Sequence, residues 1–152
     1  MSAEVRIRSA AGADLEALGA LKLRASLAWG DHARALKAMP DARTVPTEHL
    51  PFVFLAVDGG RILGFATVLP SDAGAELEDL FVDPAVWRRG VGRRLMDEAA
   101  RRALALGASS LHLIANPHAQ GFYAACGFEE IGEAATELGP AVEMELRLAA
   151  GA

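Results

Sequence analysis

Two apolar segments joined by a glycine turn constrain the fold of this chain more than any other feature. Residues 52–57 and 61–69 are mainly apolar, and Asp58, Gly59 and Gly60 separate them. Aspartate followed by glycine favours a tight hairpin turn, because glycine readily adopts the positive φ angles that such turns require. The sequence therefore predicts an antiparallel β-hairpin over residues 52–69.

Other periodic patterns predict the remaining elements. The clearest helix is predicted over residues 91–106, where apolar side chains recur at helical spacing and Gly107 follows as a C-terminal cap. Weaker patterns predict helices over residues 14–29, 31–39 and 119–126, and strands over residues 5–7, 75–82, 110–115, 128–131 and 142–148. This order predicts an α/β domain of mixed α+β type, in which about four helices flank a mostly antiparallel sheet of about six to seven strands.

Length and cysteine content limit the class of protein. With 152 residues, of which 52% are apolar, the chain fits a single domain over residues 1–152 that buries its own core. Cys126 is the only cysteine, so an internal disulfide and a cysteine-based zinc site are excluded. The four histidines show no paired metal-ligand spacing, so we expect no metal.

The acidic balance argues against two further classes. The chain has 20 acidic and 15 basic residues and a net charge of -5, which is unfavourable for nucleic-acid binding through phosphate contacts. No basic segment followed by an apolar stretch opens the sequence, and no run of about 18 apolar residues occurs. We therefore expect a soluble, cytoplasmic protein with no nucleic-acid or membrane partner.

One segment departs from this acidic balance. Six of the 15 basic residues are arginines within residues 88–102, and the glycine-containing segment Trp87–Arg93 lies between a predicted strand and a predicted helix. Free N–H groups at a helix start, the helix dipole and glycines together form an anion site, typically for phosphate. A solvated arginine face is the alternative. The GK[ST] of a Walker loop is missing, and Leu95 stands where a dinucleotide fingerprint needs its third glycine.

At these residues the sequence resembles the GNAT-type N-acetyltransferases. The resemblance rests on two motifs at the spacing of the family: Leu80–Pro84 followed by Arg89–Gly92, and later Asn116, Ala119, Phe122–Tyr123 and Gly127–Phe128. The motifs lie within residues 77–128, and the order of elements agrees over residues 5–148. One position departs from the family pattern. The family's phosphate loop usually begins with Arg or Gln, and Trp87 stands at that position, with Arg88 next to it.

The resemblance implies that acetyl-CoA is the acyl donor and that an acceptor amine attacks its thioester directly. The pantetheine arm would pair with the strand edge at residues 80–82, and the pyrophosphate would lie on amides of residues 88–93. The implied cofactor-binding residues are Leu80, Phe81, Val82, Arg88, Arg89, Gly90, Val91, Gly92, Arg93 and Asn116. Asn116 would hydrogen-bond the pantetheine or a water, and it can also cap the helix that follows it.

Two catalytic residues follow from the resemblance. Tyr123 matches the family position whose hydroxyl assists departure of the CoA thiolate, and a tyrosine with a pKa near 10 is protonated at about pH 7. Glu78 is the first candidate for the group that accepts the amine proton, with Glu76, Asp79 and water as alternatives. Packing of Tyr123 in the core and simple solvation of the three carboxylates are the structural alternatives.

The predicted function is transfer of the acetyl group of acetyl-CoA to a primary amine of a small molecule or peptide end. The alternatives are a non-catalytic acetyl-CoA-binding regulatory module and, less favoured by charge, a nucleic-acid-binding domain that uses the arginine-rich helix. Trp29 and His32 lie in the region that shapes the acceptor pocket in the family. A homodimer through the exposed edge of the C-terminal strand is a further expectation. The sequence does not name the acceptor.

Overall fold

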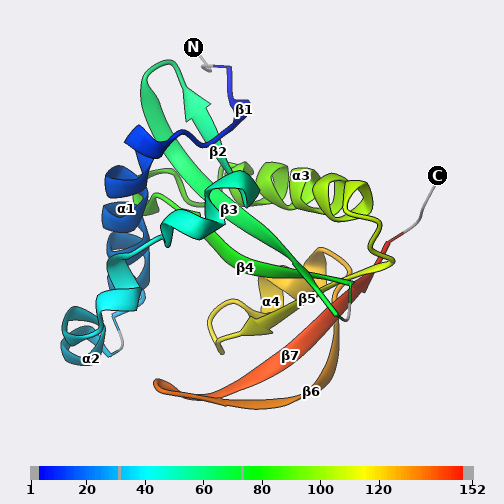
Figure 1. Ribbon diagram of the computed structural model, residues 1–152. Coiled ribbons are helices and arrows are strands. Elements are labelled where there is room, and N and C mark those ends of the chain that lie inside the picture. The colour runs from blue at the N-terminus through cyan, green and yellow to red at the C-terminus, as the bar shows by residue number, and fades with distance from the viewer. Residues whose placement is uncertain (1–3, 31, 73, 149–152) are drawn as a thin grey trace. The chain divides into compact units, whose positions relative to one another are not determined.

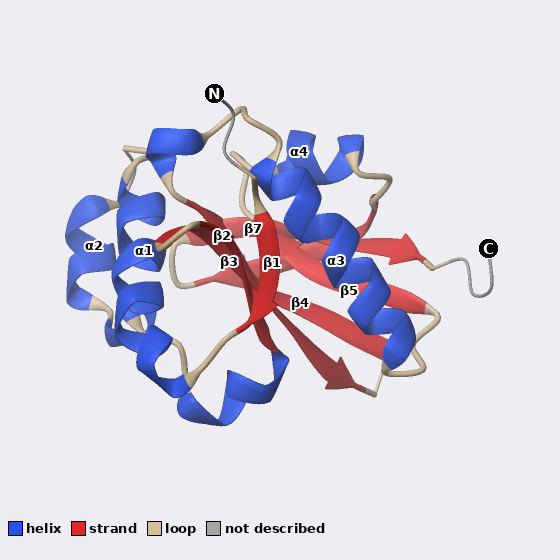
Figure 2. Ribbon diagram, turned by 90° about the horizontal axis from the view of Figure 1, so that it is seen from above, coloured by secondary structure: helices blue, strands red, loops and turns tan. Residues whose placement is uncertain are grey.

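The computed structural model describes residues 4–30, 32–72 and 74–148. Figures 1 and 2 show its helices and strands. The strands are β1 (Arg6–Ser9), β2 (Val53–Asp58), β3 (Arg61–Ser71), β4 (Gly74–Val82), β5 (Ser110–Ala115), β6 (Glu129–Thr136) and β7 (Gly139–Arg147). The α-helices are α1 (Leu15–Leu27), α2 (Ala33–Ala38), α3 (Val91–Ala105) and α4 (Gln120–Ala125). Short 3₁₀ turns lie at Gly12–Asp14, Pro40–Arg43, Thr47–Phe52 and Pro84–Val86.

The strands of the described residues form a seven-stranded sheet in the order β1-β2-β3-β4-β5-β7-β6. The pairs β1–β2, β2–β3, β5–β7 and β6–β7 are antiparallel. β4 and β5 are parallel, with Ala75 opposite Leu111. The predicted mixed α/β class and its mostly antiparallel sheet are therefore confirmed.

Contacts between residues divide the chain into two compact units. The first unit contains Met1–Thr67 and Asp79–Glu98, and the second unit contains Val68–Glu78 and Ala99–Ala152. β3, β4 and α3 each contribute residues to both units. The expectation of one domain over residues 1–152 stays a prediction.

The first unit is built on the predicted hairpin. β2 and β3 pair antiparallel from Val53 opposite Thr67 to Asp58 opposite Arg61, around the tight turn at Gly59. Alternate residues of β2 contribute to an apolar core with α1, whose buried members are Leu18, Leu21, Ala25, Val45, Val53, Leu55, Val57 and Phe65. A Cβ at Gly19 would collide with the Arg43 carbonyl, so glycine allows α1 to pack closely there. Both views show α1 and α2 side by side.

The second unit contains the long β6–β7 hairpin, drawn in orange and red in Figure 1. β7 pairs with β5 from Ser110 opposite Arg147 to Ala115 opposite Val142. Alternate side chains of β5 are buried, whereas Ile114 between them is 51% exposed. Residues 129–147, the hairpin itself, contain Glu129, Glu130, Glu133, Glu137, Glu143, Glu145 and a single basic residue, Arg147. The hairpin is thus acidic, and its outer strand β6 is largely exposed.

The element boundaries differ from the predicted ones mainly in polar segments. β6 continues to Thr136, beyond the predicted strand over residues 128–131. The sequence does not predict this extension, because most of the residues of β6 are exposed and show no alternating apolar pattern. β7 begins at Gly139 instead of Val142, where the hairpin turn ends. α2 begins at Ala33, and Asp31, the predicted start of this helix, lies outside the described residues.

Candidate functional site

The segment between β4 and α3 is anchored to β3 at its first residue. The backbone N–H of Asp83 donates to the carbonyl of Leu63 at 2.8 Å. One residue further along β3, a Cβ at Gly64 would lie 2.7 Å from the Phe81 carbonyl oxygen and 3.2 Å from Val82 Cα. No side chain fits in that space, so glycine is required for this close approach of β3 and β4.

The carboxylate of Asp83 fixes the next turn. It accepts hydrogen bonds from the backbone N–H of Ala85 at 3.0 Å and from the Arg24 guanidinium at 3.2 Å, and Arg61 lies 3.7 Å away. Burial is the largest single influence and favours the neutral acid, but the Ala85 N–H and the two arginines together outweigh it. The pKa of Asp83 is therefore lowered, and the ionised form holds the turn.

Trp87 closes this turn from the other side. Its indole N–H donates to the carbonyl of Val82, the last residue of β4, at 2.8 Å. Its ring stacks against that of Trp29, with ring centroids 4.7 Å apart. Trp87 occupies the position that usually holds Arg or Gln in the family, so the structure shows what the departure does: an aromatic side chain ties the loop back to the strand.

The chain then turns sharply into α3. Arg88 and Gly90 have positive φ angles of 66° and 82°. This conformation is strained for arginine and unstrained for glycine, so the strain is concentrated at Arg88. Residues held in such conformations cluster at ligand-binding sites, where the surrounding structure maintains them. A side chain at Gly90 would meet nothing within 4 Å, so the loop is open at this point.

The first turn of α3 supplies the groups that bind anions. Its first intrahelical hydrogen bond runs from the Arg94 amide to the Gly90 carbonyl at 3.1 Å, and the amides of residues 91–93 precede it. No acidic residue lies in this turn, and Arg88, Arg89 and Arg93 are exposed. The Arg94 guanidinium donates to the Val5 carbonyl at 3.0 Å and so fixes the helix start. These amides, the helix dipole and the arginines fit a diphosphate group.

The end of β4 is bonded to β3 along one edge. The backbone groups of successive residues in a strand point to opposite edges, and the Asp83 N–H points to β3. The backbone groups of Leu80 and Val82 therefore point to the other edge, where the Val82 carbonyl accepts the Trp87 indole N–H. Two of the predicted contacts have side chains that are turned inward. Phe81 packs against the apolar core, 5.8 Å from the Phe65 ring, and Val91 is 3% exposed.

Asp79 is a buried carboxylate within β4, with only 4% of its surface exposed. The Thr67 hydroxyl donates to it at 2.9 Å, and the Lys22 ammonium lies 3.5 Å away. Lys22 also donates to the Thr44 carbonyl at 3.3 Å and lies 5.9 Å from the centre of the Phe81 ring. The sequence does not predict this cluster of Lys22, Asp79 and Thr67, because its members are far apart in the chain.

The other two carboxylates of β4 lie in different surroundings. Glu78, the predicted proton acceptor, is exposed. Glu76 is partly buried and lies opposite His112 of β5, which in turn faces Glu145 of β7 at 3.4 Å. Of the three candidates, Glu78 is the most exposed, whereas Asp79 already accepts a hydrogen bond from a hydroxyl and faces an ammonium.

The predicted groups of the second unit lie on and before α4. Tyr123 is partly buried, with its ring 5.4 Å from Phe122 and 5.7 Å from Phe128 in edge-to-face arrangements. Asn116 follows β5, and its side-chain oxygen accepts the Ala119 N–H at 3.1 Å, as a residue at a helix start does. That bond leaves the side-chain amide nitrogen of Asn116 for another partner.

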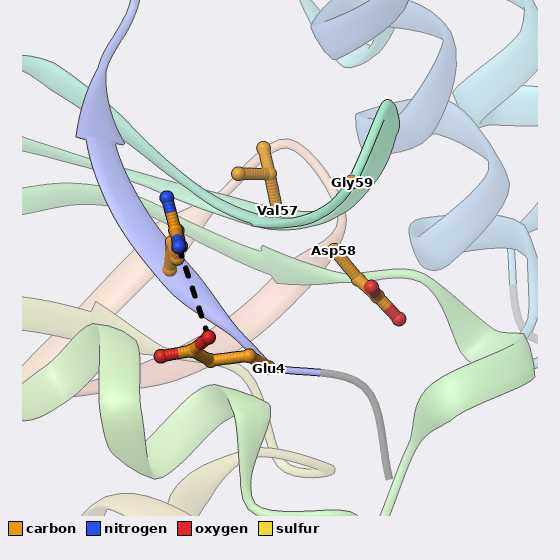
Figure 3. Close-up of a pocket in the computed structure, with 5 residues that line it drawn as sticks. Glu4, Val57, Asp58 and Gly59 are labelled. Atoms are coloured by element: carbon orange, nitrogen blue, oxygen red, sulfur yellow. Dashed lines mark ion pairs between the residues drawn. The ribbon is translucent and has the colours of Figure 1, made fainter. Parts of the chain in front are cut away.

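Figure 3 shows a pocket of about 300 Å³ elsewhere in the first unit, lined by Glu4, Arg6, Val57, Asp58 and Gly59. Its Glu4–Arg6 ion pair, at 3.7 Å, joins two largely exposed side chains. No predicted site residue lines it, so we assign it no part in the site. Within the described residues, no three potential ligands gather as a metal site requires, and no helix is long and apolar enough to cross a membrane.

Comparison with known proteins identifies the family of the chain. The sequence profile described as the Acetyltransferase (GNAT) family matches residues 21–128. This chain belongs to the GNAT acetyltransferase family. The match includes β4, the loop before α3 and α4, which are the elements that carry the two sequence motifs. No curated protein sequence matches the chain.

Several solved structures share the GNAT fold of this chain. The ribosomal-protein-S18-alanine N-acetyltransferase from Escherichia coli is 23% identical, with a TM-score of 0.71 over 98% of this chain and 97% of that one. The PaiA N-acetyltransferase from Thermoplasma acidophilum, in complex with coenzyme A, is 18% identical, with a TM-score of 0.80 over 95% and 99%. An aminoglycoside 6′-N-acetyltransferase complexed with coenzyme A is 16% identical, with a TM-score of 0.73 over 93% and 96%.

Proposed function

We propose that this GNAT protein transfers the acetyl group of acetyl-CoA to a primary amine of a small molecule or peptide end. The observation that carries the proposal is the anchored loop before α3, whose amides of residues 91–93 and neighbouring arginines fit the pyrophosphate of CoA. Similar folds in complex with coenzyme A support the choice of donor. The backbone groups of Leu80 and the Val82 N–H point away from β3, which supports pairing with the pantetheine arm. The Val82 carbonyl already accepts the Trp87 indole N–H.

The proposed transfer is a single displacement. The amine nitrogen forms a bond to the thioester carbonyl carbon, the carbon–sulfur bond breaks, and the sulfur leaves as a thiolate. A neutral amine nitrogen loses one proton as the amide forms, and the thiolate takes one up, so the reaction benefits from a proton donor. An amine with a pKa of about 10 is mostly protonated at neutral pH, so its ammonium form must first lose a further proton to an acceptor before the nitrogen can attack.

Glu78 is the proton acceptor in this proposal. Its exposure supports the role, because a base that takes a proton from an incoming amine has to be open to that amine. The contacts of Asp79 with Thr67 and Lys22 argue against Asp79, since its carboxylate already compensates a buried positive charge. If Glu78 accepts the proton, Glu78→Gln lowers turnover most below the pKa of the amine, and an unchanged pH profile would leave Glu76 or water.

Tyr123 and Asn116 complete the proposed roles. The Tyr123 hydroxyl donates a proton or hydrogen bond to the departing sulfur, and a phenol with a pKa of about 10 carries that proton at neutral pH. The amide nitrogen of Asn116, which the Ala119 contact does not use, binds the pantetheine or a water. Both roles come from the family match, and the half-buried ring of Tyr123 is compatible with a structural role as well.

A non-catalytic acetyl-CoA-binding module is the second candidate, because the same loop supports donor binding without chemistry. The deciding experiment measures free thiol released from acetyl-CoA with a broad panel of amines. We expect release that depends on one class of amine and a mass increase of one acetyl group on that amine. Calorimetric binding of acetyl-CoA without release for any amine would instead support the regulatory module.

A further inference from the structure

We infer that Trp29 is a positioning residue for the phosphate loop, Trp87–Arg93, and that it acts through Trp87. The inference rests on the proposed function and extends it to the residues that follow α1. From the sequence, Trp29 is expected in the region that shapes the acceptor pocket. In the structure its ring stacks against that of Trp87, the first residue of the phosphate loop.

Stacking of Trp29 restrains the position of the Trp87 side chain. The planes of the two rings are inclined by 32° at a centroid separation of 4.7 Å, within the range of favourable aromatic pairs. Trp87 is fixed at the same time by its indole bond to the Val82 carbonyl and by a backbone bond to the Pro84 carbonyl at 3.3 Å. Trp29 therefore restrains the side chain that closes the turn between β4 and the loop.

Two further contacts hold the strand and the turn that lead into the loop. Lys22 of α1 pairs with Asp79, and Arg24 pairs with Asp83. The residues at positions 79, 83 and 87 are thus each held by α1 or by the residues that follow it. Trp29 provides the contact nearest to the phosphate-binding amides in sequence.

The strained backbone after Trp87 explains why this restraint matters. Arg88 has a φ angle of 66°, and non-glycine residues keep such conformations only where neighbouring structure fixes them. The anchored Trp87 precedes Arg88, and the start of α3 follows three residues later. Without the Trp29 contact, Trp87 gains freedom, Arg88 can relax, and the amides that follow lose their common direction.

Exposure separates this role from ordinary core packing. Trp29 is 42% exposed, so it is not part of the core, although more than half of its surface is buried. Leu106, at the end of α3 in the second unit, is also 42% exposed and makes a matched control for loss of a large apolar side chain. A purely structural effect would appear in thermal stability for both positions, and a positioning effect would appear in donor affinity for Trp29 alone.

The experiment compares Trp29→Ala, Trp29→Phe and Leu106→Ala with the wild type, using calorimetry with coenzyme A and steady-state kinetics. We expect Trp29→Ala to raise the Kd for coenzyme A and the KM for acetyl-CoA by about three- to tenfold, with kcat at saturating acetyl-CoA unchanged. Trp29→Phe keeps an aromatic ring against Trp87 and should restore affinity to within about twofold of wild type. Leu106→Ala should bind coenzyme A like the wild type.

A second variant keeps the inference testable if Trp29→Ala does not fold. Trp87→Phe retains an aromatic ring for stacking, although a smaller one, and removes the donor to the Val82 carbonyl, so it should weaken coenzyme A binding in the same way. Since Trp29 and Trp87 are the only tryptophans, the fluorescence of Trp29→Phe reports Trp87 alone and should change saturably as coenzyme A is added.

Three outcomes would overturn the inference: wild-type affinity in Trp29→Ala, a rise in KM for the amine alone, or equal impairment of Trp29→Phe and Trp29→Ala. The second outcome would assign Trp29 to the acceptor pocket. Absence of coenzyme A binding by the wild type would instead contradict the proposed function, so the two failures are distinguishable.

Discussion

The phosphate loop of the first unit and the β6–β7 hairpin of the second unit are built in opposite ways. The loop is held by residues distant in sequence, since Leu63 anchors Asp83 and Trp29 stacks on Trp87. The hairpin is paired locally, its outer strand β6 is largely exposed, and it contains six of the chain's acidic residues. A diphosphate needs fixed backbone groups, whereas an exposed hairpin leaves its side chains free to vary. Substitutions that disturb the contacts of the first unit should therefore change donor affinity and stability. Tyr123 lies on α4 of the second unit, outside the hairpin, and its substitution should change turnover.

The largest expected effect tests the second half of this comparison. Tyr123→Phe keeps the ring and its edge-to-face contacts with Phe122 and Phe128 and removes only the hydroxyl. Loss of one proton donor lowers kcat by about 10²- to 10³-fold, toward the lower end of general acid effects, because a thiolate is already a tolerable leaving group. Donor affinity and thermal stability should stay close to wild type. A kcat within about twofold of wild type, with chemistry rate-limiting, would make Tyr123 a packing residue.

The next effect tests how firmly the loop is held. Gly64→Ala introduces a methyl group 2.7 Å from the Phe81 carbonyl oxygen, so β3 and β4 must separate where the loop begins. Overpacking of this kind costs about 1–3 kcal/mol of unfolding free energy, which denaturant titration measures. Gly60→Ala is the control, since a Cβ there meets nothing within 4 Å. Equal stability of the two variants would show that the strands do not approach each other as closely as this account requires.

The smallest effect concerns pH. The pKa of Asp83 is lowered on folding, so its ionised form stabilises the fold above the unfolded pKa of about 3.9, and this contribution is lost as pH falls through the folded value. Asp83→Asn should cost about 1 kcal/mol near neutral pH, and the difference from wild type should shrink below about pH 4. Asp72→Asn, at an exposed position, removes the same charge and should cost less. A difference that is constant with pH would argue against the Arg24 and Arg61 contacts.

Much of the fold is predictable because its signals are local. The Asp58-Gly59-Gly60 turn predicts the β2–β3 hairpin, and the apolar spacing before Gly107 predicts α3; both predictions are confirmed. β6 is the opposite case. Its residues are mostly exposed, and its register is set by pairing with β7, so residues 132–136 carry no signal of their own.

The candidate site is less predictable because its supports are distant in sequence. Glycines and arginines before α3 predict the anion-binding loop, but nothing near Asp79 indicates that Thr67 and Lys22 will surround it. In the same way, the sequence at Trp87 shows a departure from the family without showing that Trp29 stacks against it. Burial and charge compensation of these residues arise only when α1, β3 and β4 have been brought together.

The central claim is that acetyl-CoA binds with its pyrophosphate at the start of α3, and calorimetry on Gly92→Glu tests it most directly. A glutamate in the first turn of a helix interacts favourably with the helix dipole, and a thermal melt of the variant shows whether it is folded. Gly60→Glu adds the same charge and bulk at the β2–β3 turn and serves as the matched control. We predict that Gly92→Glu weakens acetyl-CoA binding by at least about tenfold while Gly60→Glu leaves it unchanged. Wild-type affinity in a folded Gly92→Glu variant would contradict the account.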